Sequence, residues 1–212
     1  MAKPTNELTP MQRQYQQIKE RNQDCILFFR LGDFYEMFNE DAKLAARELD
    51  LTLTSRDRSK PKEEQTPMCG VPYHSVDSYI ARLVQKGYKV AICEQMEDPA
   101  LAKGLVERDI TRIVTPGTVT ESCMLDESKN NYMGCLYGEG GRFGLAFCDV
   151  STGAFFVTLC ADAQSVASEL GRFSPSEVMR FGTDVNSEAI EDALFRRLSC
   201  CVDEGKDGQF SL

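Results

Sequence analysis

The most constraining feature of this sequence is a mostly apolar run at 26–31 (ILFFRL) that ends in Gly32-Asp33. A short apolar run bounded by turn residues predicts a buried strand, and a Gly-Asp pair at its end is typical of a turn. If the backbone stays extended after the turn, the side chains of Phe34 and Glu36 point to the same side. An aromatic ring beside a carboxylate at a protruding edge can stack on a flat ligand and hydrogen-bond to the edge of that ligand.

Helical and strand patterns alternate through the first half of the chain. Thr9 before Pro10, with Gln12 at the third helical position, has the residues of a helix start with a capping box. Apolar spacing gives the remaining elements. It places helices at 10–22, 38–49 and 76–86, strands at 25–31, 49–54, 88–93 and 108–115, and a loop at 55–67. This alternation predicts an α/β domain, α+β in the wider sense, around a mixed sheet.

The pattern changes after a polar segment at 126–131. Three apolar runs follow, and short glycine-containing connections separate them, which is typical of antiparallel hairpins. The runs cover 132–137, 143–149 and 154–160, and they precede a helix near 163–171, a strand near 177–181 and a helix near 187–198. The order βββαβα is that of ribonuclease H-like domains. We therefore expect two domains, 1–118 and 129–212, joined by a linker at 119–128.

The net charge of −9 by itself argues against binding to nucleic acid. The charge is unevenly distributed, however. Residues 1–115 carry 17 Lys and Arg against 18 Asp and Glu, whereas the rest of the chain carries 7 against 15. The acidity therefore belongs to the second half, and the first half is close to neutral. A local basic stretch in the first half contains Arg56, Arg58, Lys60 and Lys62.

The nine cysteines are scattered and form no Cys-x-x-Cys pair. A disulfide framework or a zinc site needs clustered spacing, so the cysteines are expected to be small buried thiols in a reducing compartment. The adjacent Cys200 and Cys201 receive no role. No apolar run approaches the length of a membrane span, and the N-terminus lacks the apolar core of a signal peptide. We expect a cytoplasmic protein.

Catalytic groups are sparse. A nuclease on the second domain would need several acidic groups that converge on metal ions, and its strands offer Asp149 and little else. His74 is the only histidine and has no matching Ser or Cys constellation, and no Gly-x-x-x-x-Gly-Lys-Ser/Thr loop is present. Two alternatives stay open beside a binding function: a metal-dependent nuclease that uses Asp149, and a scaffold whose acidic half docks a basic partner.

A single phenylalanine after a strand usually belongs to the core, but the flanking Gly-Asp and Glu favour an exposed Phe34, which suits a wedge into stacked bases. Unstacking a base step costs a few kcal/mol, stacking a base on an aromatic ring returns about 1–3 kcal/mol, and a mismatched base is cheaper to unstack. Glu36 would be repelled by phosphates and would thus penalise ordinary duplex, unless a base donates a hydrogen bond to it or it takes up a proton. Within the basic stretch, Arg56 lies nearest the strand end and is the best candidate for a phosphate contact.

Five segments together resemble the N-terminal part of the bacterial MutS family, which recognises mismatches in DNA repair. They are FRLGDFYEMF at 29–38, PMCGVPYH at 67–74, VAICEQ at 90–95, VER at 106–108 and RIVTPGT at 112–118. The resemblance implies that a Phe-x-Glu motif enters the minor groove, with Phe34 stacked on a mispaired or unpaired base and Glu36 hydrogen-bonded to it. Arg56 and Arg108 fall where the family has basic residues close to DNA. Asp33 and Tyr35, within the same motif, complete the predicted DNA-binding set.

The second half resembles the connector domain of the same family, on element order and on phrases such as DVSTG at 149–153. That domain is ribonuclease H-like without nuclease activity, and it relays to MutL and to the ATPase domains. The resemblance implies a non-catalytic fragment that ends at Leu212 before the connector is complete and lacks the lever, clamp and ATPase parts. It implies no metal or cofactor here, with ATP and magnesium needed only in full length. The implied partners are duplex DNA with mismatches or small insertion/deletion loops and a MutL-like protein, with homodimers in full length and a monomeric fragment.

Overall fold

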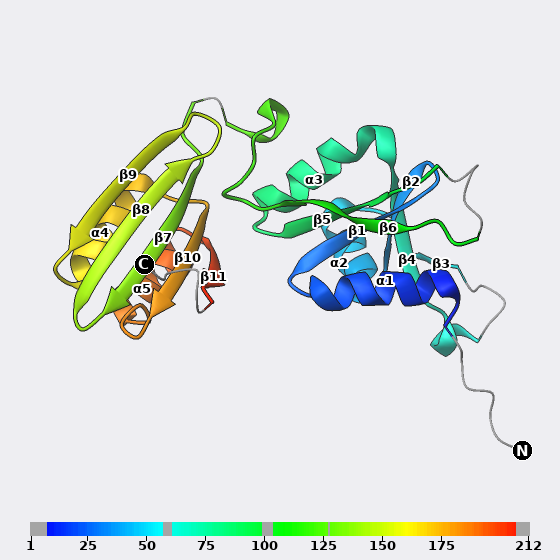
Figure 1. The fold of residues 1–212 in the computed structure, drawn as a ribbon, viewed down its shortest axis with the longest axis horizontal. Coiled ribbons are helices and arrows are strands. Elements are labelled where there is room, and N and C mark those ends of the chain that lie inside the picture. Colours follow the sequence, from blue (N-terminus) through cyan, green and yellow to red (C-terminus); the bar gives the residue numbers. More distant parts are fainter. Residues whose placement is uncertain (1–7, 57–60, 99–103, 127, 207–212) are drawn as a thin grey trace, which may run out of the picture. The chain divides into compact units, whose positions relative to one another are not determined.

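The computed structural model describes residues 8–56, 61–98, 104–126 and 128–206, which divide into two structural units (Figure 1). The first unit takes the residues up to Val84 together with Lys89–Val114. The second takes Gln85–Tyr88 together with the residues from Thr115 on. The domain limits predicted from the sequence stay predictions. Among the described residues, no helix has both the length and the apolar character that crossing a bilayer requires.

The first unit is built on a six-stranded mixed sheet with the order β3-β4-β2-β1-β5-β6. Strand β1 lies inside this sheet, antiparallel to β2 and parallel to β5, and the other described pairs are antiparallel. The elements are α1 (Pro10–Arg21), β1 (Cys25–Leu31), β2 (Phe34–Phe38), α2 (Asn39–Leu49), β3 (Thr54–Ser55), β4 (Pro67–Pro72), α3 (Val76–Gln85), β5 (Lys89–Gln95) and β6 (Arg108–Val114), with short 3₁₀ turns at Lys62–Glu64 and Tyr73–Ser75.

Helix α1 begins as the sequence predicts and covers one face of the sheet. The Thr9 side chain accepts from the Gln12 backbone N–H, and the Gln12 side chain accepts from the Thr9 N–H, which forms the predicted capping box. Tyr15 then packs edge-on against Phe29 and Phe38, with ring centroids 5.4 and 4.9 Å apart. These contacts fix α1 on the face of the sheet to which Phe29 and Phe38 point.

Helix α2 packs on the opposite face of the sheet. The Cys69 thiol, on strand β4, donates to the Ala42 carbonyl across 3.4 Å. At the start of α2, the buried carboxylate of Asp41 accepts from Lys19 Nζ at 2.9 Å and from the Leu27 N–H at 3.0 Å. Arg82 of α3 donates to the Leu49 carbonyl at 3.2 Å, which links α3 to the C-terminal end of α2.

The predicted strand at 49–54 is wrong. Asp50 ends α2 in the left-handed region (φ 57°), and the Leu51 N–H still donates to the Ala46 carbonyl at 2.9 Å. This helix end turns the chain away from the sheet, so only Thr54 and Ser55 pair, as β3. Leu53, expected to be half-buried, is 47% exposed. Local apolar alternation was outweighed here by the geometry of the helix terminus.

Two strands of the first unit were not predicted. The sequence pattern gives the residues of β2 only as an extended continuation of the turn, and β4 contains Pro67, Gly70 and Pro72, which argue against a strand. The prolines stand at the two ends of β4, where a missing N–H costs little. Gly70 lies opposite Glu36, where an added Cβ would meet the Tyr35 carbonyl oxygen at 3.2 Å.

The second unit is a five-stranded sheet with the order β11-β10-β7-β8-β9. Its elements are β7 (Tyr132–Glu139), β8 (Arg142–Asp149), β9 (Ala154–Cys160), α4 (Ala163–Phe173), β10 (Glu177–Gly182), α5 (Glu188–Glu191) continued by a π-helical turn (Asp192–Arg197), and β11 (Cys201–Glu204), with a 3₁₀ turn at Ser122–Met124 before them. The antiparallel meander β7-β8-β9 and the order βββαβα are confirmed. Strand β11, parallel to β10, was not predicted, because it has only four residues and Asp203 and Glu204 begin a polar stretch.

The core of the second unit lies between the sheet and its helices. Fully buried Leu136 and Phe147 of the sheet share it with Leu170 of α4 and Leu194 of the π-helical turn. Phe147 also stacks on Phe173, with ring centroids 4.1 Å apart. The apolar residues that recur every second position in the strands therefore pack against those that recur every 3.6 positions in the helices, as the sequence pattern predicts.

Two glycines give a matched test of this second sheet. Gly182 has φ +115° and pairs with Gly138, and a Cβ on it would lie 2.1 Å from the Gly138 carbonyl oxygen. Gly182→Ala should destabilise the second unit, because positive-φ strain costs about 1–3 kcal/mol and overpacking costs about 1–3 kcal/mol more. Gly171→Ala, in α4 with no heavy atom within 4 Å, should stabilise it by about 0.5–1 kcal/mol. Urea unfolding of both variants measures this, and equal effects would contradict the assigned packing.

Candidate nucleic-acid interface

Phe34 stands at the first position of β2, directly after the turn that ends β1. Gly32 occupies the left-handed region (φ 58°), and Phe34 pairs with Leu31 across the turn. The Phe34 ring is 47% exposed, which is unusual for a phenylalanine in a sheet whose other rings are buried. The exposed ring argues against the core alternative and leaves its face available to a flat partner.

Glu36 lies on the same face of the sheet as Phe34, two residues along β2. It pairs with Phe29 on β1 and with Gly70 on β4, so β-strands flank it on both sides. Burial raises the pKa of the Glu36 carboxyl, and the charge of Arg56 acts in the opposite direction. The carboxyl group therefore takes up a proton more readily than an ordinary surface glutamate does.

Arg56 is brought to Glu36, as an ion-pair partner. Its Nη1 donates to Glu36 Oε2 at 3.3 Å, and the Arg56 side chain is 47% exposed. The sequence predicted Arg56 as a phosphate contact and did not predict the pair. Of the other basic residues in that stretch, Arg58 and Lys60 lie outside the described residues.

Arg108 is buried, and the protein itself engages its donors. Its Nε donates to the Arg30 carbonyl at 2.7 Å, and its Nη1 donates to the Val106 carbonyl at 2.8 Å and to Gln14 Oε1 at 3.1 Å. The guanidinium also lies 5.1 Å from the centroid of the Phe29 ring. Burial lowers the pKa of Arg108. This arrangement ties β6 to β1 and α1, and the contact with DNA stays a prediction for this residue.

Asp33 and Tyr35, which complete the predicted set, occupy different environments. Asp33 is exposed in the turn, and its carbonyl accepts from the Tyr73 N–H at 3.0 Å. Tyr35 is 4% exposed on the other face of the sheet, where its hydroxyl donates to the Glu94 carboxylate. The structure thus brings together Phe34, Glu36 and Arg56 and places Tyr35 beneath the turn.

Sequence reasoning missed a cluster that lies behind this turn. The Arg30 guanidinium lies there over the rings of Tyr35 and Tyr73, and Glu94 pairs with Arg30 and accepts from the Tyr35 hydroxyl. A signal was available, because Arg30 is the one charge inside an otherwise apolar buried run. A charge at such a position needs partners, although the sequence does not say which.

Asp149, the residue on which the nuclease alternative depends, caps a turn. Its buried Oδ1 accepts from the Ser151 N–H at 2.9 Å, the Ser151 hydroxyl at 2.6 Å and the Thr152 N–H at 3.2 Å, and Oδ2 accepts from the Asn131 N–H at 3.2 Å. Burial acts to raise the Asp149 pKa, but these hydrogen bonds outweigh it and the pKa is lowered. Among the described residues, no three His, Cys, Asp or Glu side chains converge as a metal site would require.

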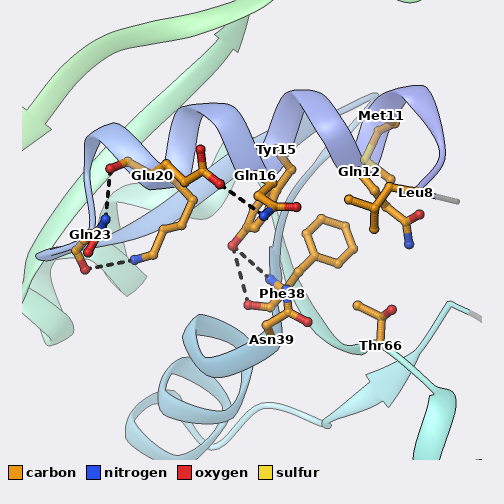
Figure 2. A pocket seen from close by; sticks show the side chains of 11 residues that line it. Leu8, Met11, Gln12, Tyr15, Gln16, Glu20, Gln23, Phe38, Asn39 and Thr66 are labelled. Atoms are coloured by element: carbon orange, nitrogen blue, oxygen red, sulfur yellow. Dashed lines mark hydrogen bonds between the residues drawn. The ribbon is translucent and has the colours of Figure 1, made fainter. Parts of the chain in front are cut away.

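A separate pocket of about 370 Å³ runs along α1 (Figure 2). The polar groups in its wall bond to one another: the Tyr15 hydroxyl contacts the Phe38 backbone, Gln16 Nε2 donates to Glu20 Oε1 at 3.1 Å, and Lys19 Nζ donates to the Gln23 carbonyl. Of the described residues that line it, none belongs to the predicted DNA-binding set. We assign no function to this pocket.

Comparison with known families accounts for both units. The family model of MutS domain I matches residues 9–123, and that of MutS domain II matches residues 131–212. The DNA mismatch repair protein MutS of Acetivibrio thermocellus is 54% identical over 206 residues, 96% of this chain and 23% of the relative. Those of Ruminiclostridium cellulolyticum and Caldicellulosiruptor bescii are each 56% identical, over 87% and 91% of this chain and 21% of each relative.

The chain thus spans between a fifth and a quarter of the length of these curated relatives. The matches run through nearly all of the described residues, and the two matched segments correspond to the two sheets. The chain belongs to the MutS family, and its two units are domains I and II of that family.

Proposed function

We propose that this chain is the mispair-sensing end of a mismatch repair protein, and that it recognises mispaired or unpaired bases in duplex DNA. The Phe34 ring enters from the minor groove and stacks on the base, and Glu36 hydrogen-bonds to the edge of that base. The observation that carries this proposal is the 47% exposure of Phe34 after a turn, with a carboxylate two residues on along the same face. Membership of the MutS family supports it.

The energetics favour weak base pairs as targets. Inserting the ring costs a few kcal/mol for each unstacked step, and the stack with Phe34 returns about 1–3 kcal/mol. A mismatched base is already partly released from its stack, so the cost falls there. One exposed ring on a rigid sheet thereby reads the deformability of DNA rather than its sequence.

Glu36 adds discrimination through its charge. In the absence of DNA, Arg56 offsets that charge across 3.3 Å. Phosphates compete for Arg56 when DNA binds, which leaves the carboxylate in a negative field that disfavours ordinary duplex. A base that donates a hydrogen bond, or a proton taken up by the carboxyl group, relieves this penalty at a mispair. Arg56 then contacts the phosphates.

The second unit serves, in this proposal, as a connector that contacts a MutL-like protein. ATP and magnesium act in parts of the full-length protein outside this chain, and no cofactor is assigned to the present residues. The full-length protein pairs as a homodimer, the 212-residue piece is a monomer, and both act in the bacterial cytoplasm at the nucleoid. The nuclease alternative finds no support, because the Asp149 oxygens are engaged by backbone and hydroxyl donors of the same unit.

Phe34→Ala in the full-length context should abolish most of the preference for a mismatch. Loss of the stack removes about 1–3 kcal/mol of binding to the mispair, which is roughly a 5- to 150-fold loss of affinity, while homoduplex binding changes little. Competition binding measures the ratio of mismatch to homoduplex affinity, at one fixed salt concentration because phosphate contacts depend on salt. Phe155→Ala, which removes a 63% exposed ring from the second unit, is the control. If Phe34→Ala kept the preference for mismatch over homoduplex, the wedge assignment would be wrong.

Glu36→Gln should tighten binding to homoduplex and narrow the specificity ratio, because the repulsion between carboxylate and phosphates is removed. The wild-type penalty on homoduplex should also shrink as the pH falls toward the raised Glu36 pKa, since the neutral carboxyl is not repelled. Glu36→Gln should show no such pH dependence.

Arg56→Gln supplies the matched comparison. It should weaken homoduplex binding, and its effect should be larger in the Glu36→Gln background, because Arg56 then has no carboxylate partner to leave before it contacts the phosphates, so the contributions of the two side chains do not add. Binding titrations between pH 5 and pH 8 test both variants. A homoduplex affinity that Glu36→Gln leaves unchanged at every pH would count against the discriminator role.

A further inference from the structure

The two backbone carbonyls of the turn before Phe34 accept hydrogen bonds from residues outside the turn. Arg30 Nε donates to the Gly32 carbonyl at 2.5 Å, and the Tyr73 backbone N–H donates to the Asp33 carbonyl at 3.0 Å. Gly32 and Asp33 are the two residues that form the turn between β1 and β2. Both peptide groups that set the direction of Phe34 are therefore anchored to residues outside the turn.

Arg30 is itself fixed by stacking and by charge. Its guanidinium carbon lies 3.8 Å from the centroid of the Tyr73 ring and 5.4 Å from that of Tyr35. Its Nη1 lies 3.7 Å from Glu94 Oε2 on strand β5. A guanidinium over an aromatic face is attracted by the quadrupole of the ring, and a planar fork held on two sides keeps its Nε directed at the turn.

Tyr35 closes the cluster. Its hydroxyl donates to Glu94, the same carboxylate that faces Arg30. Burial and the contact with Glu94 raise the pKa of Tyr35 to about 12, so the hydroxyl keeps its proton at neutral pH. Because Tyr35 follows Phe34 directly in β2, the cluster grips the chain immediately before and immediately after the exposed ring.

The cluster lies on the opposite face of the sheet from Phe34 and Glu36. Arg30 pairs with Tyr35, and Leu31 pairs with Phe34. Successive residues of a strand point to opposite faces, so Arg30 points away from the surface to which the Phe34 ring belongs. Arg30 can therefore act on a base only through the turn.

We propose that Arg30 and Tyr73 are positioning residues, which fix the direction of the Phe34 ring before DNA arrives. This inference rests on the proposed function and deepens it. The balance between unstacking a base and stacking it on Phe34 is close, so a turn that had to become ordered on binding would lose the advantage. A turn that is already ordered keeps this advantage, and mispair recognition then depends on residues other than those that meet the mispaired base.

The test compares Tyr73→Leu and Arg30→Gln with Tyr73→Phe in the full-length protein. Tyr73→Phe keeps the aromatic face over Arg30 and is the matched control. The first measurement is hydrogen exchange at the turn amides, from Gly32 to Phe34, without DNA. We expect exchange to rise about 3- to 30-fold in Tyr73→Leu and Arg30→Gln, as expected from the loss of a cation–π contact, and to match the wild type in Tyr73→Phe.

The second measurement is the ratio of mismatch to homoduplex affinity, taken in the wild-type and Phe34→Ala backgrounds. Tyr73→Leu and Arg30→Gln should lower the ratio about 3- to 30-fold with Phe34 present and should have no effect on it in Phe34→Ala. An effect that persists in Phe34→Ala, faster exchange with an unchanged ratio, or a Tyr73→Phe variant that behaves like Tyr73→Leu would each overturn the positioning role.

Failure of the proposed function has a different signature. If Phe34→Ala alone leaves discrimination intact, the wedge assignment fails whatever Arg30 and Tyr73 do. The exchange measurement, made without DNA, still reports whether these two residues hold the turn. An unchanged exchange rate in both Tyr73→Leu and Arg30→Gln would overturn the anchoring described here, independently of any DNA result.

Discussion

The register between β1 and β2 is the constraint on which the site depends. Leu31 pairs with Phe34, Arg30 with Tyr35 and Phe29 with Glu36. Because the side-chain period of a strand is two, a slip by one residue would move every side chain of β2 to the other face. Tyr35 would then be exposed, and Phe34 and Glu36 would be buried. The two-residue turn with Gly32 at positive φ fixes this register, and the Arg30 and Tyr73 contacts hold the turn.

The parts of the fold that could be predicted from sequence are those that local chemistry decides. The capping box at Thr9 and Gln12 depends on residues within one turn of helix, and the hairpins of the second unit depend on short glycine-containing connections. The buried strand β1 was likewise predicted from its own apolar residues. Strand β4 was not, because its prolines and glycine read locally as breakers. It exists because β2 and β3 supply its hydrogen bonds, a tertiary effect that outweighs propensity.

The candidate site divides in the same way. That Phe34 and Glu36 share a face follows from strand periodicity, and the exposure of the ring agrees with the turn chemistry before it. The partners of these residues come from far along the chain: Arg56 reaches Glu36, and Glu94 and Tyr73 reach Arg30. Such contacts require the strand order β4-β2-β1-β5, which sequence spacing does not reveal. The available signal was Arg30, a charge inside an apolar run, which indicates that this position needs partners but does not identify them.

The roles of the acidic residues likewise depend on the partners that the fold supplies, which the local sequence does not reveal. Asp149 is the residue on which the nuclease alternative depends, yet four donors from its own turn and from Asn131 saturate it. Glu177, buried on β10, accepts from the Gly117 N–H at 2.9 Å and from the Thr115 hydroxyl, and so fixes the first residues of the second unit. Among the described residues, Glu36 pairs with Arg56, whose side chain is 47% exposed. A carboxylate saturated by fixed donors stabilises a fold, whereas a carboxylate paired with a half-exposed arginine can exchange that partner, and this difference supports the ligand-facing role proposed for Glu36.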